Sequence, residues 1–434
     1  ETLAQKASLI ATYITNMIGV DVTAEQGTNP KEGDIYLGLD ESAKIAAIGE
    51  EGYQMEVGDA VSVISSTKEG AFYGGVTAVQ ALYLSKDTKT IQKGISRDYP
   101  KYEVRSIALD IARSEIQLDY IKEITEILPF FKINEIVMHI NDDRGDKITD
   151  KNIGSENNQE QARDLSSFRI ENEKGIGSHS YQISKEDYIQ YQKDAKEYGV
   201  AVITELDTPA HSAVFSLLPE MKENMYDVRH LKISEDSSAP VEDVKLHQPT
   251  IDFIDGLTEE LIGDGPGDAV IQSDVFHFGT DEYDTSANHS EAMQQYINHY
   301  VDFIQSRGYE ARAWASTDGA SGFKGYVTPQ NKEVTYYLWA PYWADVKKTL
   351  ANGNPIINCS GSWLYIVPGG NNNYHDYLNV EDLFENWSVN NITTTRGSGG
   401  AVIPISHPQL RGASVVLWND DGFLEDGISD FDIY

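Results

Sequence analysis

Two adjacent carboxylates, Asp281 and Glu282, follow the alternating apolar run Val275 to Phe278 and a glycine. A buried strand that ends in two acids is unfavourable, because removing a carboxylate from water costs free energy. Such acids are therefore expected to have partners or a function. Asp281 could cap the next helix with Glu282 in its solvated first turn, or the pair could transfer protons in a reaction. Taken alone, the pattern favours the helix cap.

Chemically capable side chains also follow most of the other predicted strands. They are Arg113, Asp142 with Asp143, Asp207 with His211, Trp314, Trp339, Tyr365, and Trp418 with Asp420. In a barrel of parallel strands the carboxyl ends meet at one mouth, so these side chains would converge there. Helix caps and core aromatics explain single cases, but not acids or aromatics at nearly every strand end. The sequence therefore predicts a functional site around Asp281 and Glu282.

The elements that would position these residues alternate between strand and helix from residue 105 onward. The strands are Ser106–Ile111, Glu135–Ile140, Ala201–Leu206, Val275–Phe278, Ala311–Ala315, Val334–Leu338, Ile356–Cys359 and Ser414–Leu417. The helices are Ile116–Phe131, Lys185–Tyr198, Glu291–Ser306, Trp343–Ala351 and Glu381–Trp387. This order predicts an α/β fold with a (β/α)8, or TIM, barrel over residues 102–434. The polar segment from about 144 to 184 is expected to be a functional loop or lid, in which only Phe168 to Glu171 suggests order.

Residues 1–101 predict a small α/β domain ahead of the barrel. Apolar positions at helical spacing within 4–17 indicate an opening helix. The expected strands are Asp34–Leu39, Gly52–Val57 and Val61–Ile64. The glycine-rich stretch 70–75 is expected to serve turns ahead of a helix over Val76–Leu82, because neither Rossmann nor Walker spacing is present.

Composition limits the partners of this 434-residue chain. The net charge of −35 excludes nucleic acid and anionic membranes, which need a basic face, and no apolar run is long enough for membrane insertion. The single cysteine, Cys359, allows no internal disulfide and no cysteine-based zinc cluster. Because the chain begins at Glu1 without an initiator methionine, we expect a trimmed form of a secreted or cell-surface, bacterial-type protein.

Acids combined with Trp and Tyr, without a metal-binding motif, point to carbohydrate. Pyranose rings offer C–H faces that pack on aromatic rings, and hydroxyls that bind carboxylates and arginine. Glycosidic cleavage needs a general acid and an anionic group that stabilises an oxocarbenium-like state. Adjacent residues such as Asp281 and Glu282 cannot easily straddle one bond. They suit a substrate whose own 2-acetamido oxygen attacks, with Asp281 holding the acetamido N–H and Glu282 protonating the leaving oxygen.

This stretch resembles the His-x-Gly-x-Asp-Glu signature of glycoside hydrolase family 20, the β-N-acetylhexosaminidases and lacto-N-biosidases. The resemblance covers essentially the whole chain, and further similar segments are 34–100, Arg105–Arg113, His139–Asp143 and Glu205–His211. It implies a retaining, exo-acting hydrolase of β-linked N-acetylhexosaminides that works through an oxazolinium intermediate. The implied substrate is an oligosaccharide or glycoconjugate, with no cofactor and no metal.

The resemblance also implies individual roles. Asp142 and His211 would tune Glu282, Arg113 would bind sugar hydroxyls, and Tyr365 would hydrogen-bond the acetamido oxygen. The walls of the pocket would be Trp314, Trp339 and Trp418.

Two positions depart from the family pattern. Val367 stands where many exo-hexosaminidases carry an acid, and Asp420, in Trp418-Asn419-Asp420, is shorter than the frequent glutamate. Both changes would alter how the non-reducing end of the sugar is held. The alternative is therefore a lacto-N-biosidase, which releases galactosyl-β1,3-N-acetylglucosamine as a unit. Candidates for its second-sugar site are Arg169, Tyr374 and Tyr377.

Two other classes of protein explain less of the sequence. A non-catalytic carbohydrate-binding barrel would keep the aromatics, but it would not need Asp281, Glu282, Asp142 and His211 together. A metal-dependent hydrolase lacks a ligand motif, because His277 lies in an apolar strand where a core histidine is expected, and no histidine pair has zincin spacing.

Overall fold

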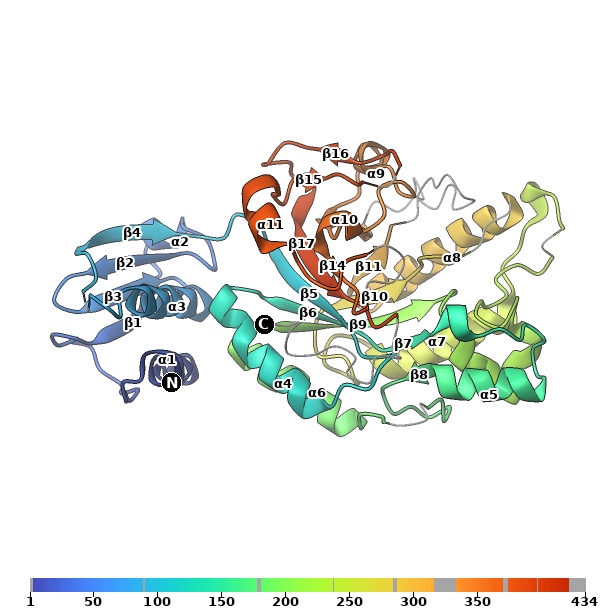
Figure 1. Ribbon diagram of the computed structural model, residues 1–434, viewed down its shortest axis with the longest axis horizontal. Coiled ribbons are helices and arrows are strands. Elements are labelled where there is room, and N and C mark those ends of the chain that lie inside the picture. The colour runs from blue at the N-terminus through green and yellow to red at the C-terminus, as the bar shows by residue number, and fades with distance from the viewer. Residues whose placement is uncertain are drawn as a thin grey trace. The chain divides into compact units, whose positions relative to one another are not determined.

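The computed structural model describes residues 3–88, 90–177, 181–236, 238–283, 287–315, 333–369, 374–395 and 397–420. The chain divides into two compact units (Figure 1). The first consists of Glu1–Glu103, Glu123–Asn134 and Asp194–Val200, and the second of Val104–Lys122, Glu135–Lys193 and Ala201–Tyr434.

The first unit contains a four-stranded sheet in the order β1-β3-β2-β4. Its elements are α1 Ala4–Ile18, β1 Ile35–Leu39, α2 Ala43–Ala46, β2 Tyr53–Val57, β3 Val61–Ser65, α3 Lys68–Leu84 and β4 Gly94–Asp98. Strands β1 and β3 are parallel, and the other two pairings are antiparallel. The three predicted strands are confirmed. Strand β4 escaped prediction because all its residues are exposed and it lacks an apolar alternation.

The glycine-rich stretch 70–75 lies inside α3, so the predicted turn is wrong. Thr67 caps this helix, and its hydroxyl accepts a hydrogen bond from the first-turn N–H at residue 70 (3.0 Å). A Cβ at Gly74 would overlap Val63 of β3. The stretch therefore allows α3 to pack closely on the sheet.

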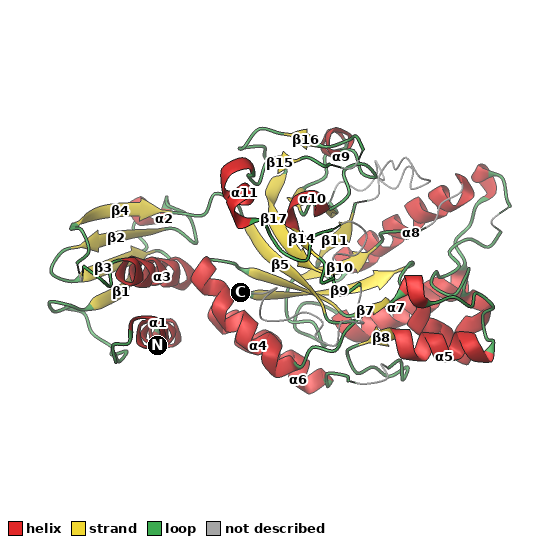
Figure 2. Cartoon of the chain, in the orientation of Figure 1, coloured by secondary structure: helices red, strands yellow, loops and turns green. Residues whose placement is uncertain are grey.

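The second unit is a closed barrel of eight parallel strands with helices around it (Figure 2), which confirms the predicted fold. In order around the barrel the strands are β5 Val104–Asp110, β6 Glu135–His139, β9 Ala201–Thr208, β10 Val275–Gly279, β11 Glu310–Trp314, β12 Thr335–Leu338, β13 Ile356–Asn358 and β17 Leu410–Leu417. The pairing of β13 with β17 closes the sheet. All eight predicted strands are present and differ from the prediction mainly at their ends.

Helices connect the barrel strands. They are α4 Leu118–Ile127 with η1 Leu128–Phe131, α6 Lys185–Tyr198, α7 Gln248–Ile262, α8 Ala287–Ser306, α9 Val346–Ala351 and α11 Val380–Asn386. Shorter pieces are η3 Ala213–Leu217, η4 Pro219–Asn224, η5 Val241–Asp243, α10 Gly361–Leu364, β14 Tyr365–Ile366, β15 Asn391–Ile392 and β16 Ala401–Val402. Helix α7 was not predicted, although Pro249 lies at its start and the apolar residues Ile251, Ile254 and Leu257 have helical spacing.

The predicted long loop over 144–184 contains regular structure and is wrong in that respect. It includes η2 Gly145–Lys147, α5 Glu156–Leu165 and β8 Ser166–Phe168, which pairs antiparallel with β7 Asn141–Asp143. Helix α5 was missed because Ala162 and Leu165 are its only apolar residues. The β7–β8 pairing brings the segment back beside Asp142 at a strand end.

A buried ion pair crosses the barrel near the amino ends of its strands. Arg312 of β11 donates to both carboxylate oxygens of Glu135 at the start of β6 (2.8 and 3.1 Å). The Arg312 residue is 1% exposed. Buried charges are tolerated when they are paired in this way, and removing one partner is strongly destabilising.

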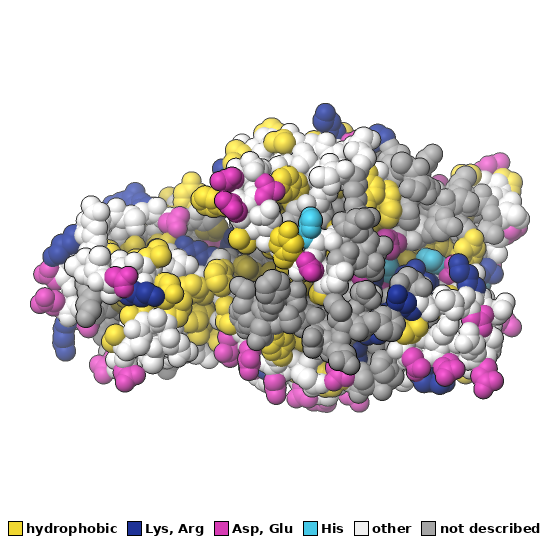
Figure 3. Space-filling view, in the orientation of Figure 1, with side chains coloured by type: hydrophobic (Ala, Val, Ile, Leu, Met, Phe, Trp, Pro, Cys, Tyr) yellow, Lys and Arg dark blue, Asp and Glu magenta, His cyan; other side chains and the backbone are white. Residues whose placement is uncertain are grey.

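The surface carries an excess of acid, with 69 Asp and Glu against 34 Lys and Arg in the chain. Figure 3 shows acidic side chains scattered over the face in view. No helix in the described ranges has the length and apolar character needed to cross a membrane.

Candidate active site

A cavity of about 640 Å³ lies at the carboxyl ends of the barrel strands. The described residues that line it are Arg113, Asp142, Asp143, Arg144, Gly145, His211, Arg229, Asp281, Glu282, Trp339, Tyr342, Trp343, Tyr365, Tyr374, Trp418 and Asp420. Of the strand-end residues predicted to converge, all except Asp207 and Trp314 are among them. Most residues that follow the barrel strands therefore line one cavity.

The backbone after β10 turns sharply and places Asp281 and Glu282 at the cavity. Gly279, Thr280 and Glu282 have φ of 70°, 87° and 52°. Such angles are unfavourable for residues with a side chain, and they concentrate at functional sites. A Cβ at Gly279 would overlap the carboxylate of Asp207, while the N–H of Thr280 donates to Asp207 Oδ1 (3.3 Å). The strained turn is thus held by its neighbour β9.

Asp281 and Glu282 converge on His211. The His211 Nε2 atom lies 3.8 Å from Asp281 Oδ2 and 3.5 Å from Glu282 Oε2. The side chain of Asp281 is 11% exposed, whereas that of Glu282 is 42% exposed. Helix α8 begins only at Ala287, so Asp281 does not cap it and the helix-cap alternative is wrong.

Burial raises the pKa of Asp281 to about 6; the nearby His211 lowers it and Glu282 raises it. Burial and the neighbouring Asp281 also raise the pKa of Asp207 well above its ordinary value. Asp207 and Asp281 therefore cannot both ionise freely, and this pair retains a proton at mildly acidic pH.

Asp142 connects the cavity floor to three cationic groups. Its Oδ2 lies 2.7 Å from Arg113 Nη2 and 2.6 Å from His139 Nε2, and its Oδ1 lies 2.8 Å from His211 Nδ1. Burial alone would raise the pKa of Asp142, but Arg113 and His211 hold it well below its ordinary value. Burial disfavours the imidazolium of His211, yet Asp142, Asp207 and Asp281 raise its pKa well above the usual range. His211 is therefore a cation beside the two central acids.

A second layer of polar groups lies beneath the floor. His139 Nδ1 is 3.1 Å from Glu205 Oε1, and the indole N–H of Trp314 donates to the same oxygen (2.5 Å). His277 is fully buried, and its Nδ1 accepts the backbone N–H of Gly279 (3.2 Å). Burial lowers the pKa of His277 to about 4, as expected for a neutral core histidine. No role was predicted for His139 or Glu205, although a polar residue inside an apolar strand can indicate a functional role.

Arg113 and Asp420 form the polar end of the cavity. Arg113 Nη1 lies 2.9 Å from Asp110 Oδ2 and 3.4 Å from Asp420 Oδ1. Its guanidinium carbon is 5.4 Å from the centre of the Trp418 ring. Burial raises the pKa of Asp420, and Arg113 opposes that shift. This corner offers both hydrogen-bond donors and acceptors beside an aromatic face, which suits a sugar ring.

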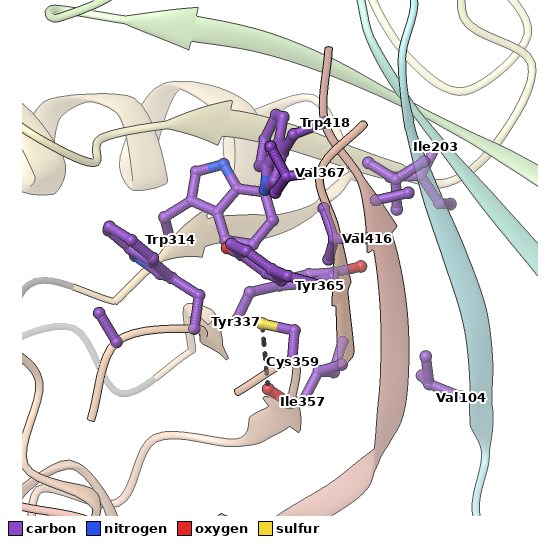
Figure 4. Close-up of a cluster of buried hydrophobic side chains, with 14 of the residues drawn as sticks. Val104, Ile203, Trp314, Tyr337, Ile357, Cys359, Tyr365, Val367, Val416 and Trp418 are labelled. Carbon is purple, nitrogen blue, oxygen red and sulfur yellow. Dashed lines mark hydrogen bonds between the residues drawn. The ribbon is translucent and has the colours of Figure 1, made fainter. Parts of the chain in front are cut away.

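Aromatic rings form a continuous wall of the cavity that includes Trp418. Trp339 and Tyr365 are parallel with centroids 6.3 Å apart, and Tyr365 meets Trp418 edge to face (6.0 Å). Figure 4 shows Tyr365 and Trp418 in one buried cluster with Trp314. Trp314 is 1% exposed and lies 5.7 Å from Trp418, so it supports the wall from behind.

The three candidates for a second-sugar site separate in the structure. Tyr374 lines the cavity, with its ring 5.1 Å from Tyr365. Arg169 is 2% exposed and donates to the backbone carbonyls of residues 111, 112 and 181, so its role is structural. Tyr377 is not among the described lining residues. Val367 is fully buried beside Trp418 and influences the cavity only through packing.

Five lining residues were not assigned to the site from the sequence. They are Arg144, Gly145, Arg229, Tyr342 and Trp343. The adjacent aromatics Tyr342 and Trp343 follow a predicted strand end and could have been found in the same way as Trp339. Arg229 comes from a loop in which no periodic pattern marks it.

Among the residues that the structure describes, three overlapping groups of carboxylates and histidines have potential metal-binding atoms within 4.8 Å of one another. They are His139-Asp142-Asp207, Asp142-Asp143-His211 and Asp207-His211-Asp281. Both oxygens of Asp142 already contact Arg113 or histidines whose pKa is raised, so a cation would have to displace protons or the guanidinium. The donor set is therefore better suited to neutralisation by the chain's own cations.

Comparison with known families agrees with this geometry. The model of glycosyl hydrolase family 20, catalytic domain, matches residues 102–421, and that of domain 2 of the same family matches residues 1–99. Over 98% of its length the chain is 24% identical to a lacto-N-biosidase of Bifidobacterium bifidum, covering 35% of that protein. Over 51% of its length it is 27% identical to a β-hexosaminidase of Porphyromonas gingivalis, covering 28% of it. The chain thus spans about a third of these relatives.

Solved structures share the fold. An exo-β-N-acetylglucosaminidase of Vibrio harveyi, in complex with N-acetylglucosamine, has a TM-score of 0.68 at 16% identity, over 97% of this chain and 65% of that one. A β-N-acetylhexosaminidase of Streptomyces coelicolor has a TM-score of 0.66 at 18% identity, over 99% of this chain and 81% of that one.

Proposed function

Because the chain belongs to glycosyl hydrolase family 20, we propose that it hydrolyses β-linked N-acetylhexosaminides from the non-reducing ends of oligosaccharides or glycoconjugates, with retention of configuration. The observation that carries this proposal is the convergence of Asp281 and Glu282 on His211 in a cavity with an aromatic wall.

The substrate supplies the nucleophile in this mechanism. Adjacent residues such as Asp281 and Glu282 do not easily place their carboxylates on opposite faces of one glycosidic bond, as a nucleophile and an acid must. The acetamido oxygen instead bonds to the anomeric carbon while the bond to the leaving oxygen breaks and Glu282 gives that oxygen its proton. Water then attacks the anomeric carbon, returns a proton to Glu282 and reopens the oxazolinium ring.

Asp281 serves the acetamido group. Its burial beside the aromatic wall favours contact with the N–H of a bound acetamido group, which becomes more acidic as its oxygen attacks. Only the ionised carboxylate accepts that hydrogen bond well, and the pKa of about 6 makes ionisation largely complete at neutral pH. His211 contributes by favouring the charged form.

Glu282 is placed for the leaving group. Its side chain is far more exposed than that of Asp281, as expected for an acid that faces the departing part of the substrate. The remaining contacts suit the sugar that is released. Arg113 and Asp420 offer partners for its hydroxyls, Trp418 a face for its ring, and Tyr365 a hydroxyl for the acetamido oxygen.

A lacto-N-biosidase remains the second candidate, and two observations favour it. The relative of that name matches 98% of the chain. The carboxylate of Asp420 also lies 3.4 Å from Arg113 Nη1. Held there, it is less able to extend to the hydroxyls at the non-reducing end of a single sugar. Two chromogenic substrates distinguish the candidates, one carrying N-acetylglucosamine and the other lacto-N-biose. Release only from the disaccharide supports the biosidase, and release from the monosaccharide supports the hexosaminidase.

The role of Glu282 is tested by varying the leaving group. Glu282→Gln should lower kcat/KM by about 10²–10⁴ on an alkyl glycoside, whose leaving oxygen needs a proton. The loss should be much smaller on a dinitrophenyl glycoside, whose leaving group departs as an anion. Equal losses on the two substrates would contradict the assignment.

A further inference from the structure

Arg229 lines the cavity from a loop with a well-defined conformation. An antiparallel bridge between Met225 and Leu231 closes the loop. Within it, Asp227 Oδ1 accepts the backbone N–H groups of Arg229 (2.8 Å) and His230 (3.0 Å). These bonds fix the backbone from which the arginine side chain extends.

The same loop is bound to the chain next to Glu282. The hydroxyl of Tyr283, which is 1% exposed, donates to the carbonyl oxygen of Leu231 (2.9 Å). The Tyr283 ring also meets the imidazole of His230 edge to face, with centroids 5.6 Å apart. The loop is therefore held in a fixed position relative to the predicted acid.

The guanidinium of Arg229 is itself oriented. Its Nε donates to Asp143 Oδ1 (2.6 Å), and Asp143 is fully buried. A Cβ at Gly145 would overlap the guanidinium, so the arginine occupies space that only glycine leaves free. Asp143 also raises the pKa of Arg229. Within the described ranges Nε is the one guanidinium nitrogen with a hydrogen-bond partner, which leaves both Nη groups for a ligand.

The two cavity arginines contact different side chains. Arg113 contacts Asp420 and Trp418, at the end assigned to the released sugar. Arg229 is held by Asp143 and lines the same cavity as Glu282. Its loop is tied through the carbonyl of Leu231 to Tyr283, the residue that follows Glu282, so the loop is anchored next to the acid that protonates the leaving oxygen.

We propose, resting on the hydrolysis proposed above, that Arg229 binds an oxygen of the leaving group and thereby selects substrates whose leaving group is a sugar. Both Nη groups are donors only, so the ligand must present acceptors, as sugar hydroxyls do. Five carboxyl groups and three arginines line the described cavity, which favours a neutral sugar over an anionic one.

The test compares two substrates that share the released glycone. One carries p-nitrophenol as its leaving group, and the other carries a β-linked sugar. Arg229→Met should lower kcat/KM on the oligosaccharide about tenfold to a hundredfold more than on the aryl glycoside, mainly through KM, because a hydrogen bond to a charged group is lost. Gly145→Ala should act in the same direction by displacing the guanidinium, and Arg229→Lys should be intermediate because it keeps the charge without the planar fork.

Arg307→Met is the matched control, since Arg307 also pairs with a carboxylate, that of Glu259 (3.1 Å), and does not line the cavity. This control should leave the ratio of kcat/KM between the oligosaccharide and the aryl glycoside unchanged. An equal loss on both substrates in Arg229→Met, or no loss on either, would overturn the proposal.

A binding measurement separates this inference from the reaction itself. In a Glu282→Gln background, calorimetry gives Kd for the intact oligosaccharide and for the glycone alone. Adding Arg229→Met should raise the Kd for the oligosaccharide, relative to the Kd for the glycone, by about tenfold or more. An unchanged ratio would overturn the role of Arg229 even if the wild-type chain hydrolyses both substrates. A changed ratio would support it even if hydrolysis fails and the proposed function is wrong.

Discussion

Replacing His211 by Asn should move the acid limb of the kcat/KM profile to higher pH. In the proposed mechanism Asp281 must be ionised to accept the acetamido N–H. Burial raises its pKa to about 6, the His211 cation lowers it, and Glu282 raises it. The wild-type limb should therefore fall near pH 6, and loss of the cation should raise the pKa of Asp281 further.

The distance between the two groups sets the size of the shift. His211 Nε2 and Asp281 Oδ2 are 3.8 Å apart. Unit charges about 4 Å apart interact by roughly 4 kcal/mol at an effective dielectric constant of about 20, and one pKa unit corresponds to about 1.36 kcal/mol. Water that enters the vacated space reduces the effect, so we expect a shift of about 1–2 units. With a pKa of about 7, roughly one-tenth of Asp281 would be ionised at pH 6, against about half in the wild type.

The assay is kcat/KM against pH on an activated aryl glycoside, because this parameter reports the free enzyme. Each profile is normalised to its own plateau, so that a lower maximum rate does not affect the comparison. His299→Asn is the matched control, since His299 also pairs with an aspartate, Asp255 (2.8 Å), and does not line the cavity. An acid limb that stays in place or moves to lower pH in His211→Asn would refute the reasoning.

Three further predictions follow from the site and the core. Asp281→Asn should lower kcat/KM by about 10²–10³, as for loss of one preorganised hydrogen bond, while the Kd for N-acetylglucosamine changes less than about tenfold; a parallel loss of binding would contradict the assignment. Dialysis against a chelator should leave activity unchanged, because arginine and protonated histidines already occupy the acidic cluster; loss of activity restored by a divalent cation would refute this. Arg312→Met should lower the free energy of unfolding in urea by about 3–5 kcal/mol, since it leaves Glu135 buried without its partner, whereas Arg307→Met on an exposed pair should cost less than about 1 kcal/mol; similar losses would argue against the buried pair.

The barrel and the floor of its site were largely predictable. Strands buried on both faces give short apolar runs, and the residue that follows each run is placed at the mouth by topology alone. That reasoning assigned Asp142, His211, Asp281 and Asp420 to one cavity although they are distant in sequence. It misplaced Trp314, because whether a strand-end side chain faces the cavity or the layer beneath depends on register, which the sequence does not reveal.

Loops and close packing were less predictable. Arg229 lies in a loop whose conformation depends on tertiary partners such as Tyr283. Gly74 resembles a turn residue but serves helix packing, because the space that a Cβ would occupy is filled by the sheet. Helix α5 has too few apolar residues for a periodic signal. The family resemblance supplied the separate roles of Asp281 and Glu282, which spacing alone could only suggest.

The central claim is that the substrate's acetamido group supplies the nucleophile. It is tested most directly by kcat/KM for two aryl β-glycosides of the released glycone, one with a 2-acetamido group and one with a 2-hydroxyl at the cleaved residue. We expect a preference for the acetamido substrate of about 10³ or more, because the other substrate lacks the intramolecular nucleophile. Comparable rates on the two substrates would contradict it.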